Sequence, residues 1–137
     1  MIDYLYVGPG DFIDVRVFGG LDAYDAHFGD NRFFRCPGSG CEFCAKGLGT
    51  FARTVLGVVD DRDGKCKAWV VSPKMLNELR SKPDLTGRGV RIIRGLRLEP
   101  PLAIPLEKKR FTKKQERLNQ DFRKEYNTHL GRSINSP

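Results

Sequence analysis

Residues 51–71, FARTVLGVVDDRDGKCKAWVV, contain two runs of β-branched and aromatic residues around a short polar stretch. The runs 51–59 and 65–71 are typical of strands, because these side chains fit the pleated surface of a sheet. Between them stands DDRDG, whose aspartates and glycine favour a turn. The stretch therefore predicts an antiparallel hairpin, and turn chemistry explains its aspartates better than a Mg²⁺ site does.

Short runs of the same kind recur on both sides of this hairpin. Glycine and proline separate them, as expected of strands joined by turns. The expected strands are 3–7, 11–18, 32–36, 90–94 and 96–104, and the Ser-Pro start at Ser72 predicts a short helix over 72–81. This order predicts a mainly β fold, an OB-like small β-barrel.

Residues 112–130 are expected to form the one long helix. Thr112 is suited to the N-cap, and Gly131 follows the last turn. An apolar stripe at four-residue spacing runs along the helix through Leu118, Phe122 and Tyr126. Two alternatives stay open for this helix: the stripe packs on the rest of the chain, or the helix reaches out to a phosphate backbone or to another protein.

The formal net charge of +7 is unevenly distributed. Residues 106–137 carry a net charge of +5, whereas residues 1–105 carry only +2. We therefore expect an OB-like domain over 1–105 and a basic C-terminal helix and tail over 106–137. The basic excess favours an anionic partner such as nucleic acid.

A chain of 137 residues is long enough for one domain with a core of its own. Its apolar runs fall short of the roughly 18 residues of a membrane span, and its first residues lack the basic and apolar regions of a signal peptide. We therefore expect a cytoplasmic protein with no membrane contact. In a reducing compartment, clustered cysteines bind metal more often than they form disulfides.

Three of the four cysteines and one of the two histidines lie in HFGDNRFFRCPGSGCEFC, residues 27–44. The spacing of Cys41 and Cys44 allows a tight turn to present both sulfurs to one ion, and Cys36 supplies a third ligand. A redox pair would require a βαβ context, which the pattern lacks. The spacing therefore favours a metal site.

Two residues compete to be the fourth ligand. His27 lies just upstream, and Cys66 lies downstream in the second strand of the hairpin. Strand alternation places Lys65, Lys67 and Trp69 on one face and leaves Cys66 on the core face, which favours His27. The predicted cofactor is a structural Zn²⁺ with protein ligands at all four positions: His27, Cys36, Cys41 and Cys44. The zinc-binding loop then spans about residues 27–50.

The order of these motifs resembles one family of proteins. The His-Cys-Cys-Cys cluster is followed by a strand hairpin, a short helix and the phrase DLTGRGV at 84–90. Over roughly residues 11 to 105 this is similar to the single-stranded-DNA-binding proteins of tailed phages that insert a zinc subdomain into an OB-fold. The resemblance implies a phage protein of replication or recombination that acts in the host cytoplasm. Members of that family end in an acidic tail, whereas this chain ends in a basic helix.

A sequence-tolerant single-strand site combines basic side chains with aromatic rings on which bases stack. In this chain the two kinds alternate on the same strand faces, and four arginines fall within residues 88–97. The residues predicted to bind nucleic acid are Arg32, Phe33, Phe34, Arg35, Phe51, Arg53, Lys65, Lys67, Trp69, Arg88, Arg91 and Arg94.

The expected function is therefore non-catalytic binding of single-stranded DNA, with RNA as the other possible nucleic acid. The alternative is a phage-type transcription regulator that binds RNA polymerase or another protein machine, such as replication proteins, through its zinc loop and basic helix. No arrangement of residues predicts a nuclease or other catalytic site, since no second carboxylate cluster accompanies the aspartates of the hairpin turn.

Overall fold

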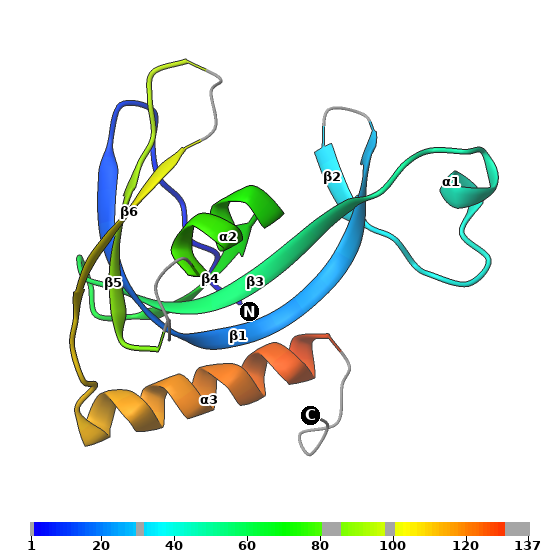
Figure 1. Ribbon diagram of the computed structural model, residues 1–137. Helices are drawn as coiled ribbons and strands as arrows, with labels where there is room; N and C mark the ends of the chain where they lie inside the picture. Colours follow the sequence, from blue (N-terminus) through cyan, green and yellow to red (C-terminus); the bar gives the residue numbers. More distant parts are fainter. Residues whose placement is uncertain (1, 30–31, 81–85, 98–100, 131–137) are drawn as a thin grey trace.

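The structure, a computed structural model, describes residues 2–29, 32–80, 86–97 and 101–130 (Figure 1). Six strands and three helices follow one another in these described residues. Their bounds are β1 Phe12–Gly29, β2 Arg32–Arg35, α1 Glu42–Ala45, β3 Phe51–Asp60, β4 Cys66–Val71, α2 Pro73–Arg80, β5 Arg88–Ile93, β6 Leu102–Lys108 and α3 Lys113–His129.

The strands form one antiparallel sheet in the order β4-β3-β1-β5-β6, with β2 paired to the end of β1. The predicted mainly β fold with a terminal helix is confirmed. The pairings among the described residues do not join β4 to β6, so closure of the sheet into an OB-like barrel stays a prediction. The segment expected as a strand over 3–7 makes only an isolated parallel bridge, between Tyr4 and Ala68 of β4.

Strand β1 is much longer than the predicted 11–18. Register shifts between Val17 and Gly19 and between Gly20 and Asp22 interrupt its pairing with β3, and Gly19 has a φ of 147°. Such bulges bend a strand without ending it. Beyond them β1 runs beside β3 as far as Ala26 and then beside β2 to Gly29, and this ribbon extends away from the body of the sheet (Figure 1). We call residues 23–54 the arm.

Both faces of the sheet are covered, each by one helix (Figure 1). Helix α2 packs Met75, Leu76 and Leu79 into a core with side chains of β1, β3, β4 and β5. Helix α3 packs Phe122 and Tyr126 into a second core on the opposite face. The inner strands therefore bury alternate residues on both sides.

The contacts of α3 decide between the two alternatives left open for it, because this helix lies on the sheet. The ring of Phe122 meets Phe18 edge-on at 6.2 Å between centroids, and Arg123 Nη1 donates to the carbonyl of Gly20 at 2.5 Å. The Thr112 hydroxyl accepts from the Gln115 amide at 3.1 Å, which confirms the predicted N-cap.

The structure differs from the predicted apolar stripe of α3 at two residues. Leu118, predicted in the packing stripe, is 42% exposed and lies at the edge of the contact. Asn119, which the stripe left out, is buried, and its side-chain oxygen accepts a hydrogen bond from Gln115 Nε2 at 2.9 Å. Gly131 lies outside the described residues.

The hairpin turn between β3 and β4 is closed by a buried carboxylate. Asp60 is fully buried, and its oxygens accept from Arg62 Nη2 at 2.8 Å and from Lys67 Nζ at 2.7 Å. Burial alone would raise the pKa of Asp60, but the hydrogen bonds from Arg62 and Lys67 outweigh it and hold this pKa well below its usual range.

The free energy of unfolding is therefore expected to fall when acid protonates the Asp60 carboxylate. A depressed carboxyl pKa stabilises the fold above the unfolded-state value of about 3.9 and loses this contribution as the pH falls toward the folded-state value. Asp60→Asn should lower the free energy of unfolding at pH 7 by on the order of 2 kcal/mol and flatten its pH dependence below about pH 4. Urea unfolding between neutral and acidic pH measures both. An unchanged acid slope in Asp60→Asn would contradict this role.

Candidate metal centre and surface groove

Four metal-ligating side chains meet in the arm. Their ligand atoms all lie within 4.8 Å of one another, and they belong to His27, Cys36, Cys41 and Cys44. His27 Nε2 lies 3.4 Å from Cys41 Sγ and 3.5 Å from Cys44 Sγ. The sulfurs of Cys36 and Cys44 are 3.6 Å apart. Around an ion with metal–sulfur bonds of about 2.3 Å and metal–nitrogen bonds of about 2.1 Å, tetrahedral ligands stand about 3.5–3.8 Å apart. The structure thus brings the predicted ligands together in a group that fits one metal ion.

Local structure positions each ligand. His27 lies near the end of β1, and Cys36 directly follows β2, which pairs with β1. Cys41 caps the short helix α1, and Cys44 lies inside that helix. Gly38 and Gly40 have φ values of 88° and 78°, a left-handed conformation that suits glycine and turns the chain between the second and third ligands.

Hydrogen bonds around the centre favour the metal-binding forms of two ligands, His27 and Cys41. His27 Nδ1 donates to the carbonyl of Gly49 at 3.1 Å, which leaves Nε2 with a free electron pair toward the cysteines. The backbone amide of Cys44 donates to Cys41 Sγ at 3.5 Å. This bond lowers the pKa of the Cys41 thiol to about 7 and so favours the thiolate that a metal requires.

Aromatic rings cover one side of the histidine. The rings of Phe34 and Phe43 each lie 5.7 Å from the His27 ring and 4.7 Å from each other. His27 itself is fully buried. Phe34 was predicted to stack nucleic-acid bases, but the structure gives its ring a partner in the metal centre.

Cys66, the rival fourth ligand, lies elsewhere. It packs against the core beneath α3, and its sulfur donates to Asn119 Oδ1 at 3.3 Å. Burial raises the pKa of its thiol to about 11, so it stays protonated at neutral pH. The expectation that Cys66 packs on the core face is confirmed.

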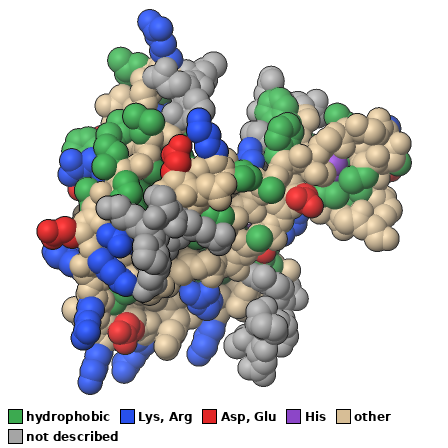
Figure 2. All heavy atoms as spheres, in the orientation of Figure 1, with side chains coloured by type: hydrophobic (Ala, Val, Ile, Leu, Met, Phe, Trp, Pro, Cys, Tyr) green, Lys and Arg blue, Asp and Glu red, His purple; other side chains and the backbone are tan. Residues whose placement is uncertain are grey.

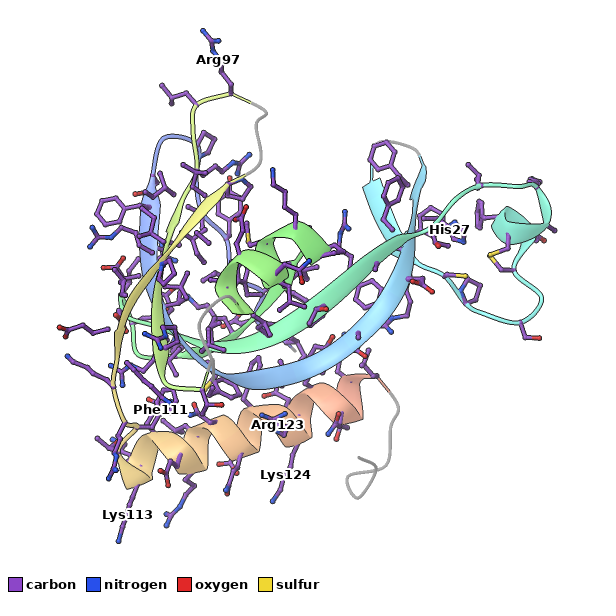
Figure 3. The ribbon with its side chains drawn as sticks, in the orientation of Figure 1. His27, Arg97, Phe111, Lys113, Arg123 and Lys124 are labelled. Atoms are coloured by element: carbon purple, nitrogen blue, oxygen red, sulfur yellow. The ribbon has the colours of Figure 1, made fainter. Side chains whose placement is uncertain are left out.

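A second candidate site is an open groove of about 520 Å³ between the N-terminal segment, β4 and the connection from β5 to β6. Tyr4 and Tyr6 line it with exposed fractions of 50% and 67%. Arg94 and Arg97 also line it, and the Arg94 guanidinium lies 5.9 Å from the centroid of the Tyr6 ring. Arg94 Nη1 donates to the carbonyl of Val7 at 2.9 Å, which fixes its position, and Arg97 stands near the tip of the connection (Figure 3).

Trp69 and Lys67 do not form the exposed face that alternation predicted for β4. Trp69 is only 7% exposed and belongs to the core beneath α2, although it also lines the groove. Lys67 pairs with Asp60 and with Asp63, and its side chain is 12% exposed. Lys65 alone of the three is exposed. Alternation predicted a solvated face because it could not reveal that helices cover both sides of this strand.

Several other residues that were predicted to bind nucleic acid lie in the arm. Arg35 forms an ion pair with Asp22, and its guanidinium lies 4.1 Å from the centroid of the Tyr24 ring. Phe51 and Arg53 share one side of β3, as predicted, with the guanidinium 5.9 Å from the ring centroid. The side chains of Arg32 and Phe33 lie outside the described part of the chain.

The arginines of β5 do not form one surface. Arg88 is half-buried, and its Nη1 donates to the carbonyl of Leu106 at 3.2 Å. Arg91 points to the opposite face, where Nε donates to Asp14 Oδ1 at 2.7 Å and the guanidinium lies 4.9 Å from the Phe12 ring centroid. Of the predicted set, only Arg94 and Trp69 meet in the groove.

Tyr4, Tyr6 and Arg97 were missed by the nucleic-acid prediction. Alternation in DYLYV carried a usable signal, because it places Tyr4 and Tyr6 on one side of the chain while Leu5 and Val7 face the core.

No protein-family model, curated protein or solved structure matches this chain. The metal centre and the groove therefore carry the functional argument, and the resemblance to phage proteins stays a prediction. No described helix has both the length and the apolar character that a membrane crossing requires.

Proposed function

We propose that this protein binds single-stranded nucleic acid, DNA in the first instance, in the groove and without catalysis. The observation that carries the proposal is the combination of Tyr4, Tyr6, Arg94 and Arg97 along one open groove. Exposed aromatic rings offer faces on which bases stack, and each stack contributes about 1–3 kcal/mol. The Arg94 guanidinium stands beside the Tyr6 ring and Arg97 lines the same groove, so both would neutralise phosphates.

Binding of this kind tolerates any sequence. Every base has a π-face, and stacking on the tyrosine rings does not depend on base identity. Such a protein would coat or protect single strands in the cytoplasm, as in phage replication or recombination.

Trp69 supplies the test, since it is the only tryptophan and lines the groove. Oligo-dT titrated into the metal-loaded protein at about 50 mM salt is expected to quench its fluorescence. With slopes near −0.7 per phosphate contact, four contacts predict that affinity falls about 50-fold at about 200 mM salt. An unchanged tryptophan signal, together with an unshifted labelled oligonucleotide, would overturn the proposal.

We assign the metal as zinc in a structural role. Three thiolates and one imidazole are ligands that zinc prefers, and four protein ligands leave no open position for a reacting water. The ion then holds the tip of the arm in shape.

The surface of the arm favours a second candidate function, which is binding to another protein. The arm exposes large apolar side chains, which are typical of protein-binding sites: Phe28, Phe43, Leu48 and Phe51. A regulator that docks this arm on a protein machine such as RNA polymerase would use them. Such a complex should survive nuclease treatment and be lost in Phe43→Ala/Leu48→Ala, whereas a complex bridged by nucleic acid would not survive.

A further inference from the structure

The solvent-facing side of α3 carries four lysine and arginine side chains that the groove does not use. They are Lys113, Lys114, Arg117 and Lys124, which we call the basic strip. All four are exposed, and basic side chains line the edge of the molecule where α3 lies (Figure 2). Lys113 and Lys124 point away from the sheet, whereas Phe111 and Arg123 point toward it (Figure 3).

The charges of the basic strip are not neutralised by ion pairs within the part of the chain that the structure describes. At 100° per residue, Lys113, Arg117 and Lys124 fall within about 35° of the direction opposite the buried Asn119, Phe122 and Tyr126, and Asp121 falls beside them. The outer face of α3 is therefore mostly basic.

Two of the cations stand where the helix disfavours them. Lys113 and Lys114 open the first turn, directly after the N-cap Thr112. The partial positive charge of a helix N-terminus disfavours cations there. Glu116 stands in the same turn and offsets part of this unfavourable charge.

The chemistry of the strip selects its partner. Lipid insertion needs an apolar helix face, but the apolar face of α3 is occupied by the sheet. The strip carries no aromatic ring on which a base could stack. What remains is a row of point charges, which suits a phosphate backbone whose bases are bound elsewhere.

The N-terminal segment runs from the sheet-facing side of α3, opposite the basic strip, to the groove. Ile2 packs with Phe122 in the core beneath α3, and the same N-terminal segment continues through Tyr4 and Tyr6 into the groove. We infer that the basic strip binds the sugar-phosphate backbone of the nucleic acid whose bases occupy the groove. This inference rests on the proposed function and adds a second, purely electrostatic contact to it.

The test compares two variants with the same loss of charge. Arg117→Gln/Lys124→Gln removes the two C-terminal cations of the strip, and glutamine is a good helix former. Lys46→Gln/Lys74→Gln removes two exposed lysines from the arm and from α2. Binding of labelled oligo-dT of about 16 and about 4 nucleotides, the range of site sizes for one OB-fold, is measured from about 50 to about 200 mM salt.

With the longer oligonucleotide, Arg117→Gln/Lys124→Gln should make the slope of log affinity against log salt concentration shallower by about 1.4. Between about 50 and about 200 mM salt, the affinity of this variant should therefore fall about 7-fold less than that of the wild type. The control variant should keep the wild-type slope, and the shorter oligonucleotide should not distinguish the two variants. Equal slopes for the wild type and the strip variant, with groove binding intact, would overturn the inference alone. Failure of the wild type to bind either oligonucleotide at about 50 mM salt would overturn the proposed function. If the protein bound vesicles containing phosphatidylserine more tightly than oligo-dT, nucleic acid would be the wrong partner for the strip.

Discussion

Cys41→Ser is expected to abolish metal binding and to unfold the tip of the arm. Cys41 is the one buried residue of the segment 37–50, so burial of apolar surface contributes little to its order. Structural zinc contributes on the order of 10–16 kcal/mol in zinc-finger peptides, and this contribution depends on the complete ligand set. Elemental analysis after dialysis should find about one zinc per chain in the wild type and about none in the variant. Limited proteolysis should then cleave within 37–50.

Cys66→Ser is the matched control for this experiment. It makes the same chemical change in a thiol that lies in the core beneath α3 and outside the metal cluster. The variant should retain its zinc and a protease-resistant arm. Loss of zinc in Cys66→Ser, or its retention in Cys41→Ser, would contradict the ligand set derived from the geometry.

Tyr6→Ala/Arg97→Ala is expected to weaken binding of oligo-dT about 150-fold. The change removes one stacking platform and one phosphate contact, together on the order of 3 kcal/mol. Both side chains are exposed in the groove, so the free energy of unfolding should change by less than about 0.5 kcal/mol. Fluorescence anisotropy of a labelled oligonucleotide measures the affinity, and urea unfolding checks stability.

Phe51→Ala/Arg53→Ala provides the comparison, since it removes the same kinds of side chain from a ring and guanidinium pair on the arm. If bases bind in the groove, this variant should stay within a few-fold of the wild type. A greater loss in the arm variant than in the groove variant would move the proposed site to the arm.

The local features of the fold were predictable because each depends on neighbouring residues. The hairpin of β3 and β4 follows from strand runs around a turn of Asp and Gly, and the start of α3 follows from Thr112 as N-cap. The metal ligands were predictable for a similar reason. Their spacing reflects chemistry that few other arrangements of three cysteines and a histidine satisfy.

The parts that were not predictable depend on contacts between distant segments. Gly19 and Gly20 suggested the end of a strand, but a bulge paired against β3 lets β1 continue past them. The expected strand 96–104 begins only at Leu102, beyond two prolines, and continues through Pro105 to Lys108. Trp69 was expected on an open face, because only the packing of α2 on that side reveals that its ring belongs to a core.

The ribbon of β1 and β3 gives the arm the topology of an insertion. Strand β2 pairs only with the part of β1 that lies in the arm, so no strand of the body depends on it. If residues 23–54 were replaced by a short turn, β1 and β3 would still be adjacent antiparallel neighbours in an unchanged sheet order. The arm is in this sense an insertion with its own candidate metal site, and among its residues Tyr24 packs against the core beneath α3. Its tip could therefore be lengthened or exchanged without a change in the strand order of the body.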